Sequence, residues 1–183
     1  MRVLDLGCGK GISLTELGVS DTDDVVGVDI DPEDLDVARI RFPHRTFVLG
    51  KGEDLSFLEA DSVERVIAEV SVPYMDIPRV LEELYRVLKP GGSLFLSLHS
   101  YEFTLRELRR TAFPKPIPTA YRLYVLANGM WFHWTGRTLR FSEKRVESFQ
   151  TERGMRKALA RAGYNQLEFT RSDPRFIVRA VRM

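Results

Sequence analysis

The chain has 183 residues, with 27 lysines and arginines against 26 aspartates and glutamates, and one cysteine, Cys8. This length suits one domain over residues 1–183, and a lone cysteine excludes an internal disulfide framework, so we expect a reducing, cytoplasmic setting. No apolar run approaches the roughly 20 residues that span a bilayer, and the short apolar N-terminal stretch runs into glycines rather than a signal-peptide cleavage site.

The two halves of the chain differ in charge. Residues 1–100 carry 10 basic and 19 acidic side chains, a net charge of −9, whereas residues 101–183 carry 17 and 7, a net charge of +10. Three interpretations stay open. The halves face each other, they pair across a homodimer, or the basic half steers an anionic substrate, RNA or an acidic membrane surface to the protein.

Strand-like and helix-like runs alternate along the first hundred residues. Hydrophobic periodicity predicts strands at 2–6, 24–30, 45–49, 63–70 and 93–99. It predicts helices at 12–19 and at 77–88, the second of which is ended by "KPGG" (89–92). A further helix is predicted to begin at Pro32, with Asp31 as its N-cap. Such alternation predicts a parallel sheet with helical crossovers.

The end of the chain has a different pattern. A helix is predicted at 151–164, with Thr151 as N-cap and Gly163 as its stop. Strands follow at 165–170 and 175–181, and the four residues between them are too few for a crossover, so these two strands are predicted to pair antiparallel.

About fifty residues, 101–150, separate the fifth strand from that last helix. They contain both tryptophans, Trp131 and Trp134, among several other aromatic residues. We predict an inserted cap with helices at 102–112 and 119–132. Because it follows the carboxyl end of a parallel strand, where α/β folds bind ligands, we expect it to act as a lid.

The stretch "VLDLGCGKG" (3–11) places a strand before a glycine-rich turn, which is typical of ligand-binding units. A phosphate-binding P-loop does not fit, because Leu4 stands where its first glycine is needed. A dinucleotide fingerprint does not fit either, because Ile12 takes the place of its third glycine. The observed pattern is an acid followed by alternating glycines, namely Asp5, Gly7, Gly9 and Gly11.

With this pattern the chain resembles class I S-adenosylmethionine-dependent methyltransferases, in particular the small-molecule enzymes of the ubiquinone/menaquinone-biosynthesis type. The resemblance rests on "VLDLGCGKG", on "VVGVDID" (25–31) and on "LEELYRVLKPGGSLFLS" (81–97), and it covers 2–100 and 151–182. It implies an α/β fold with a doubly wound, Rossmann-like sheet of seven strands. The implied strand order is 3-2-1-4-5-7-6, with strand 7 antiparallel and a helical insertion after strand 5. Relatives usually carry one or two helices before the first strand, and we expect these to be lacking here.

The resemblance also implies S-adenosylmethionine as the cofactor. The backbone of Gly7 to Gly11, with Cys8 in the turn, meets its carboxylate, and Asp5 orients the loop and the amino group. Asp29 binds the ribose hydroxyls and Ile30 packs on the adenine. The remaining cofactor-binding candidates are Gly52, Glu53 and Glu69. Relatives carry an aspartate where this chain has Lys51, so the backbone of Gly52 and the side chain of Glu53 or Asp54 are expected to take over that contact. No metal site is expected.

Methyl transfer chiefly requires that acceptor and sulfonium be held in line, and a base is needed only if the acceptor must lose a proton. His99, at the end of the fifth strand, is the candidate base, because neutral imidazole accepts a proton near pH 7. Tyr74 is expected beside it as a wall of the acceptor pocket, and His133 lies among the aromatic residues of the insertion.

We therefore predict an enzyme that transfers a methyl group from S-adenosylmethionine to a small, partly apolar acceptor. One alternative is an RNA or protein N-methyltransferase. "SVPY" (71–74) resembles the Asn/Asp/Ser-Pro-Pro-Tyr/Phe motif of such enzymes, with Val72 in place of the first proline, and the second half of the chain is basic. The other alternative is a cofactor-binding relative without catalytic activity.

Overall fold

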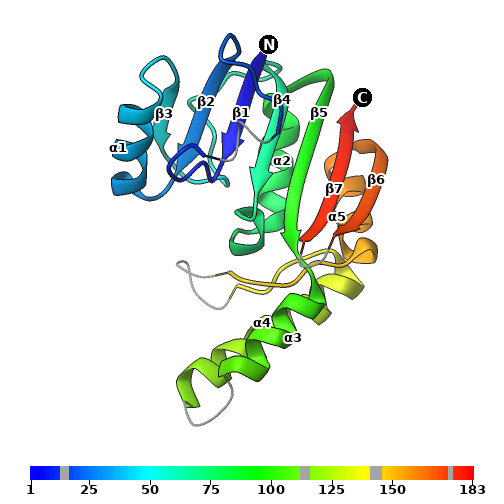
Figure 1. The fold of residues 1–183 in the computed structure, drawn as a ribbon. Helices are drawn as coiled ribbons and strands as arrows, with labels where there is room; N and C mark the ends of the chain where they lie inside the picture. The colour runs from blue at the N-terminus through cyan, green and yellow to red at the C-terminus, as the bar shows by residue number, and fades with distance from the viewer. Residues whose placement is uncertain (13–16, 112–115, 141–145, 173–174) are drawn as a thin grey trace.

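The computed structural model describes residues 1–12, 17–111, 116–140, 146–172 and 175–183 (Figure 1). Its centre is a seven-stranded sheet of order β3-β2-β1-β4-β5-β7-β6. The strands are β1 (Arg2–Leu6), β2 (Asp24–Asp29), β3 (Thr46–Leu49), β4 (Val63–Glu69), β5 (Leu88–His99), β6 (Tyr164–Ser172) and β7 (Arg175–Arg182). Strand β7 pairs antiparallel with both β5 and β6, whereas β1 to β5 pair in parallel, which confirms the predicted order and orientation.

The helices are α1 (Pro32–Arg41), a short 3-10 turn η1 (Val72–Tyr74), α2 (Ile77–Val87), α3 (Tyr101–Thr111), α4 (Pro116–Thr135) and α5 (Glu152–Ala162). Helices α2 and α5 pack on one face of this sheet and α1 on the other, whereas α3 and α4 lie beyond the strand ends (Figure 1). Among the described residues, no helix is both long and apolar enough to cross a membrane.

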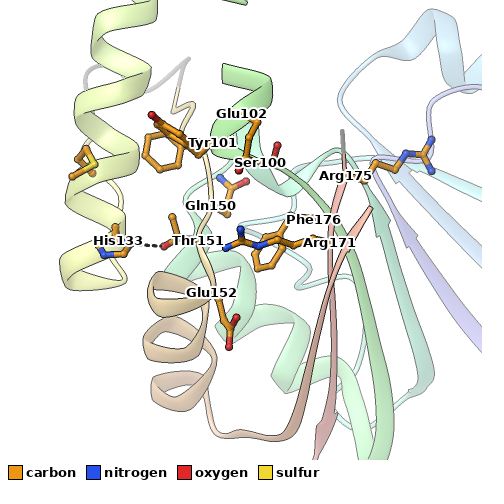
Figure 2. Close-up of a pocket in the computed structure, with 12 residues that line it drawn as sticks. Ser100, Tyr101, Glu102, His133, Gln150, Thr151, Glu152, Arg171, Arg175 and Phe176 are labelled. Atoms are coloured by element: carbon orange, nitrogen blue, oxygen red, sulfur yellow. Dashed lines mark hydrogen bonds between the residues drawn. The ribbon is translucent and has the colours of Figure 1, made fainter. Parts of the chain in front are cut away.

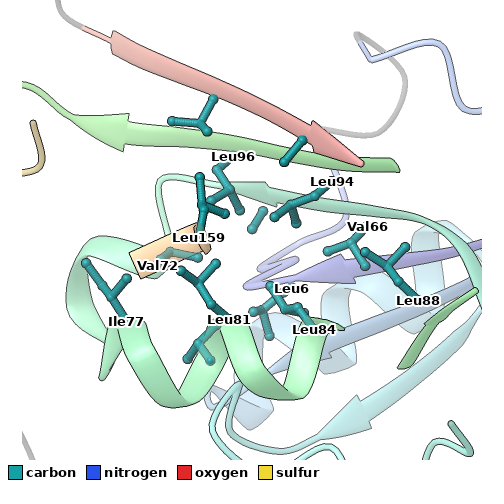
Figure 3. Close-up of a cluster of buried hydrophobic side chains, with 14 of the residues drawn as sticks. Leu6, Val66, Val72, Ile77, Leu81, Leu84, Leu88, Leu94, Leu96 and Leu159 are labelled. Atoms are coloured by element: carbon teal, nitrogen blue, oxygen red, sulfur yellow. The ribbon is translucent and has the colours of Figure 1, made fainter. Parts of the chain in front are cut away.

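The main core lies between the sheet and helices α2 and α5 (Figure 3). Leu6 of β1, Leu84 of α2, Leu96 of β5 and Leu159 of α5 meet there with almost no exposed surface. Fully burying one such side chain contributes about 1.5–3 kcal/mol to folding. Alternate strand residues point to the opposite face, so Val3 packs in a second, smaller cluster there.

Three helix ends follow the predicted capping chemistry. The carboxylate of Asp31 accepts hydrogen bonds from the backbone N–H groups of Glu33 and Asp34 at the start of α1. Thr151 accepts one from Gly154 in the same way at the start of α5, and Gly163 ends that helix with a left-handed φ of 98°. These predictions depended on neighbouring residues alone, and the structure confirms them.

Two predicted boundaries are wrong. The "KPGG" segment does not separate helix from strand, because α2 ends at Val87 and β5 starts at Leu88, which pairs with Val63. A register shift before the pair Arg65–Ser93 accommodates the extra residues. The predicted helix at 12–19 has its middle, 13–16, outside the described residues, and the part from residue 17 is a turn in which Gly18 has a φ of 71°.

The insertion after β5 consists of α3 and α4, which lie beyond the carboxyl ends of β4 and β5 (Figure 1). The chain then returns through residues 146–150, all of which are buried. In this return segment (146–150), the Ser148 N–H donates to the Pro73 carbonyl (3.2 Å) and the Gln150 N–H to the His99 carbonyl (3.0 Å). The insertion is therefore tied to the loops that follow β4 and β5.

Ion pairs connect the acidic and basic halves of the chain. Arg175 contacts Glu69 (2.6 Å) and Arg140 contacts Asp76 (2.9 Å). The charge difference seen in the sequence thus corresponds, at these two places, to the interpretation in which the halves face each other.

Candidate functional site

The glycine loop directly follows β1. Its three alternating glycines have φ angles of 73° (Gly7), 48° (Gly9) and 75° (Gly11), a region that side chains disfavour. A β-carbon on Gly7 would lie 2.2 Å from the β-carbon of Ser71, so only glycine fits there, whereas on Gly9 it would meet nothing nearer than Asp34 at 3.6 Å. Gly9 therefore leaves space beside its backbone for a ligand.

The end of β2 holds this loop in place. The carboxylate of Asp29 accepts hydrogen bonds from the Gly9 N–H (2.8 Å) and the Asp31 N–H (3.0 Å). The N–H groups of Gly7 and Cys8 both donate to the Val28 carbonyl. These loop amides already have acceptors inside the protein, which departs from the expectation that they stay open for a carboxylate.

Asp5 lies beneath the loop with only 1% of its surface exposed, and its Oδ2 has no hydrogen-bond partner among the described residues. Burial, followed by the negative charges of Glu69 and Asp29, raises the pKa of Asp5 to about 7. A buried carboxylate oxygen without a donor is costly, and three acids close together repel one another. A positively charged donor at this place would relieve both penalties.

Cys8, in the middle of the loop, is not suited to nucleophilic chemistry. Burial and the charges of Asp5 and Asp29 raise the pKa of its thiol, so it stays protonated. Its side chain packs with Leu35, Ala38 and Phe47 against α1.

The structure brings His99 and Tyr74 together. Their rings contact edge to face with centroids 5.2 Å apart, and the ring of Phe103 in α3 stacks on His99 at 4.5 Å. Burial lowers the pKa of His99, so its imidazole is neutral near pH 7, and burial raises the pKa of Tyr74. Tyr74 is still 51% exposed, so it remains accessible from solvent.

Two residues that the sequence did not single out, Phe103 and Arg175, contact this site. Glu69, at the end of β4, pairs with Arg175, which lies opposite His99 in the antiparallel register of β7 and β5. Phe103 was not predicted, because its contact with His99 depends on how α3 leaves the sheet. Arg175 was not predicted either, since it was treated only as the start of a strand.

A family model described as a methyltransferase domain matches residues 4–96, just over half of the chain. The chain belongs to this methyltransferase family. The matched segment runs from β1 into β5, and so contains the glycine loop, Asp29 and the loop after β4.

Several methyltransferases share this segment. An uncharacterised methyltransferase of Mycobacterium tuberculosis is 43% identical over 95 residues, which are 52% of this chain and 38% of that protein. An arsenite methyltransferase of Aquipseudomonas alcaligenes is 40% identical over 110 residues, covering 52% of this chain and 32% of that protein. The chain thus spans less than half the length of these relatives.

The similarity to solved structures extends over the whole chain. A crystal structure of an S-adenosylmethionine-dependent methyltransferase from Methanosarcina mazei has a TM-score of 0.69 and 19% identity, and covers 100% of this chain and 92% of that one. At this identity the match shows the methyltransferase fold.

S-adenosylmethionine is the cofactor that membership of the methyltransferase family implies, and the residues present fit it. The molecule carries an ammonium group and a sulfonium, both positive. Asp5, which has an unsatisfied oxygen, and Asp29 are acidic side chains of this site, whereas Glu69 is already paired with Arg175. Ile30, next to Asp29, is 67% exposed and so available to pack on a flat ring.

Two further candidate cofactor-binding residues, Gly52 and Glu53, have structural contacts of their own. A β-carbon on Gly52 would lie 2.8 Å from the sulfur of Met75, so its glycine is explained by packing. The carboxylate of Glu53 accepts a hydrogen bond from the Asp76 N–H (2.9 Å) at the start of α2. The segment 51–54 is therefore held beside the end of β1 by Met75 and Leu6, and its role toward an adenine remains a prediction.

Proposed function

We propose that the chain transfers a methyl group from S-adenosylmethionine to a small, partly apolar acceptor. The observation that carries this proposal is the unpartnered Asp5 oxygen beneath the glycine loop, with the negative charge of Asp29 near it. Negative charge in a buried site favours a cationic ligand over a neutral or anionic one. This feature supports a sulfonium cofactor rather than a nicotinamide dinucleotide with its pyrophosphate.

Asp29 is proposed to hold the ribose. Its two oxygens accept from Gly9 and Asp31, but a carboxylate has about four lone-pair sites, so two stay available for hydroxyl groups. Asp5 is proposed to accept from the ammonium group, and the open backbone at Gly9 allows the cofactor to approach closely.

S-adenosylmethionine supplies an activated methyl group on a positively charged sulfur, which becomes a neutral thioether when the acceptor takes the methyl. The acids of this site favour the charged form, so they contribute to cofactor affinity and to product release rather than to the rate of transfer. Rate is proposed to come from positioning of the acceptor between Tyr74 and the insertion.

His99 is proposed as the base when the acceptor must lose a proton. Its lowered pKa leaves one ring nitrogen of the imidazole unprotonated near pH 7. Its contacts with Tyr74 and Phe103 fix the ring plane. The insertion, with α3 and α4, is proposed to act as a lid over an apolar acceptor.

The RNA or protein N-methyltransferase alternative depends on the "SVPY" loop. Here the Ser71 hydroxyl donates to the Leu6 carbonyl (2.6 Å), and Val72 and Pro73 are buried, which favours a structural role for the first three residues. Only Tyr74 is exposed. This geometry makes the small-molecule acceptor the better-supported proposal. A measurement of catalytic turnover is what would exclude a cofactor-binding protein without catalytic activity.

Calorimetric titration with S-adenosylmethionine, with S-adenosylhomocysteine and with NAD tests the cofactor. We expect micromolar binding of the first and none of NAD, and binding of neither would overturn the proposal. Transfer of a labelled methyl group is then measured with small apolar alcohols, amines and acids, with bulk RNA and with bulk protein. Label in the RNA or protein fraction alone would favour the N-methyltransferase alternative. The absence of label from every fraction would favour the cofactor-binding protein without catalytic activity.

A further inference from the structure

A cavity of about 530 Å³ lies between the insertion, the start of α5 and the β6–β7 hairpin (Figure 2). Its apolar wall consists of Tyr101, Met130, Phe149 and Phe176. No described residue along its wall belongs to the cofactor-binding or catalytic candidates discussed above. Its volume falls in the range of pockets that enclose drug-sized molecules.

Gln150 contributes an unsatisfied polar group to this wall. The side chain is only 2% exposed, and its Nε2 donates to the carbonyl (2.6 Å) and to the hydroxyl (3.1 Å) of Ser148. Because a carbonyl accepts only from the NH₂ end of the amide, the orientation of the amide is settled. Its Oε1 has no partner in the described part of the chain, so a buried acceptor that needs a donor lies in a residue that lines the cavity.

The same cavity offers positive charge. Arg171 lies on its wall and has no ion-pair partner among residues that the structure describes, whereas the charge of Arg175 is neutralised by Glu69. Glu152 is likewise occupied, since it pairs with Arg156 (2.7 Å), which leaves Glu102 as the other acid on the wall.

A basic groove continues from the cavity and shares Arg171 and His133 with it. The groove adds Arg153, whose guanidinium lies 4.4 Å from the centre of the Trp134 ring, and Lys157, which donates to the Trp134 carbonyl. The N-terminus of α5, an eleven-residue helix, opens at the same place and carries a partial positive charge. Anions are therefore favoured at the mouth of the cavity.

We propose that this cavity binds a small molecule with an aromatic body, an anionic group and a ring N–H or hydroxyl donor. The Arg171 guanidinium takes the anion, a carboxylate or a phosphate ester, with its planar pair of donors. The Gln150 oxygen accepts the N–H or hydroxyl hydrogen, and the four apolar side chains enclose the ring. The wall includes Tyr101 of α3 and Met130 of α4, which belong to the proposed lid, but binding is measured without the methyl donor, so its failure is distinguishable from failure of the proposed transfer reaction.

Four matched probes test each feature by calorimetric titration of the full chain without S-adenosylmethionine. Indoleacetate has all three features, indoxyl phosphate exchanges the carboxylate for a phosphate, indoleacetamide lacks the charge, and naphthylacetate lacks the N–H. We expect at least one of the two anionic indoles to bind, and the amide and the naphthyl acid each to bind about tenfold more weakly.

Variants then assign the effect to residues. Arg171→Met should remove the preference for the acid over the amide, and Arg171→Lys should restore part of it. Gln150→Met should remove the preference for the indole over the naphthyl acid. Arg161→Met, an exposed arginine of α5 away from the cavity, is the control and should behave as wild type. Circular dichroism and melting curves verify that each variant is folded.

Three results would overturn the proposal. They are the absence of binding by both anionic indoles at millimolar concentration, wild-type affinity for the amide that equals its affinity for the anionic indole that binds, and unchanged binding of that indole by Arg171→Met. Binding of only one anionic indole supports the proposal and distinguishes a carboxylate ligand from a phosphate ester.

Discussion

A β-carbon on Gly7 would stand 2.2 Å from the β-carbon of Ser71, so the loops after β1 and β4 touch at a point that has no room for another atom. The Ser71 hydroxyl also donates to the carbonyl of Leu6, the residue before Gly7. The loop proposed to hold the cofactor and the loop that leads to Tyr74 are therefore packed as one unit.

The first prediction compares two glycines with similar φ angles, Gly7 at 73° and Gly91 at 80°. Gly91→Ala meets no atom within 4 Å, so it should cost only the left-handed backbone strain of about 1–2 kcal/mol. Gly7→Ala also pays for the clash with Ser71, which adds about 1–3 kcal/mol. Urea denaturation of both variants measures this, and equal losses of stability would contradict the proposed packing.

The second prediction separates two neighbouring acids. Asp29→Ala should weaken S-adenosylmethionine binding about ten- to a hundredfold, because hydrogen bonds to a charged group are lost. Asp31→Ala should cost about 1 kcal/mol of stability through its lost N-cap, with cofactor affinity intact. Calorimetry and denaturation on both variants test the pair, and unchanged affinity in Asp29→Ala would refute the ribose assignment.

The third prediction concerns Asp5 and pH. Its pKa is about 7 in the folded protein and about 3.9 in an unfolded chain. Between these values the folded state keeps a proton that the unfolded state has lost, so the contribution of Asp5 to stability becomes less favourable as pH rises from about 4 to 7 and is level above that. The total change is up to about 4 kcal/mol.

Asp5→Asn removes this dependence. The variant should therefore gain stability over wild type at pH 8 and show little difference at pH 4, while its affinity for S-adenosylmethionine falls. Denaturation at the two pH values isolates Asp5, because every other titrating group is common to both proteins. The same stability difference at both pH values would show that Asp5 titrates normally.

The fourth prediction tests His99 as a base. With an acceptor that must lose a proton, His99→Gln should lower kcat about 10²- to 10⁴-fold and leave cofactor affinity unchanged. Because burial lowers the pKa of His99, the wild-type rate should fall only as pH drops below about 6.5. His44→Gln, at an exposed position, is the matched control. Full activity in His99→Gln would leave positioning as the mechanism.

Local chemistry explains which parts of the fold could be predicted. Asp31, Thr151 and Gly163 act on residues within one helical turn, so their capping roles were readable from the sequence and are confirmed. The sheet order came with the family resemblance and is confirmed as well. The start of β5 was mispredicted because Leu88 is drawn into the sheet by its pairing with Val63, a contact 25 residues away that local propensity does not contain.

The candidate site was predictable along single strands but not across them. Asp5, Asp29 and His99 each end or lie in a strand, and the parallel order brings those ends to one edge. The contact of Glu69 with Arg175 and the unpartnered oxygen of Gln150 depend on the antiparallel return of β7 and on the path of the chain after α4. No spacing or periodicity in the sequence carries that information.

The return segment (146–150) is hydrogen-bonded to Pro73 and His99, next to Tyr74, whereas α3 and α4 project away from these attachments (Figure 1). Because the insertion is attached at its base, the choice of acceptor and the geometry of the cofactor site can change separately. Apart from Phe103, which stacks on His99, the residues of α3 and α4 can change in composition, and hence in what they admit, while the return segment holds the sheet edge in place. A chimaera that exchanges α3 and α4 but retains Phe103 and the return segment should therefore acquire a different acceptor range on an unaltered cofactor site.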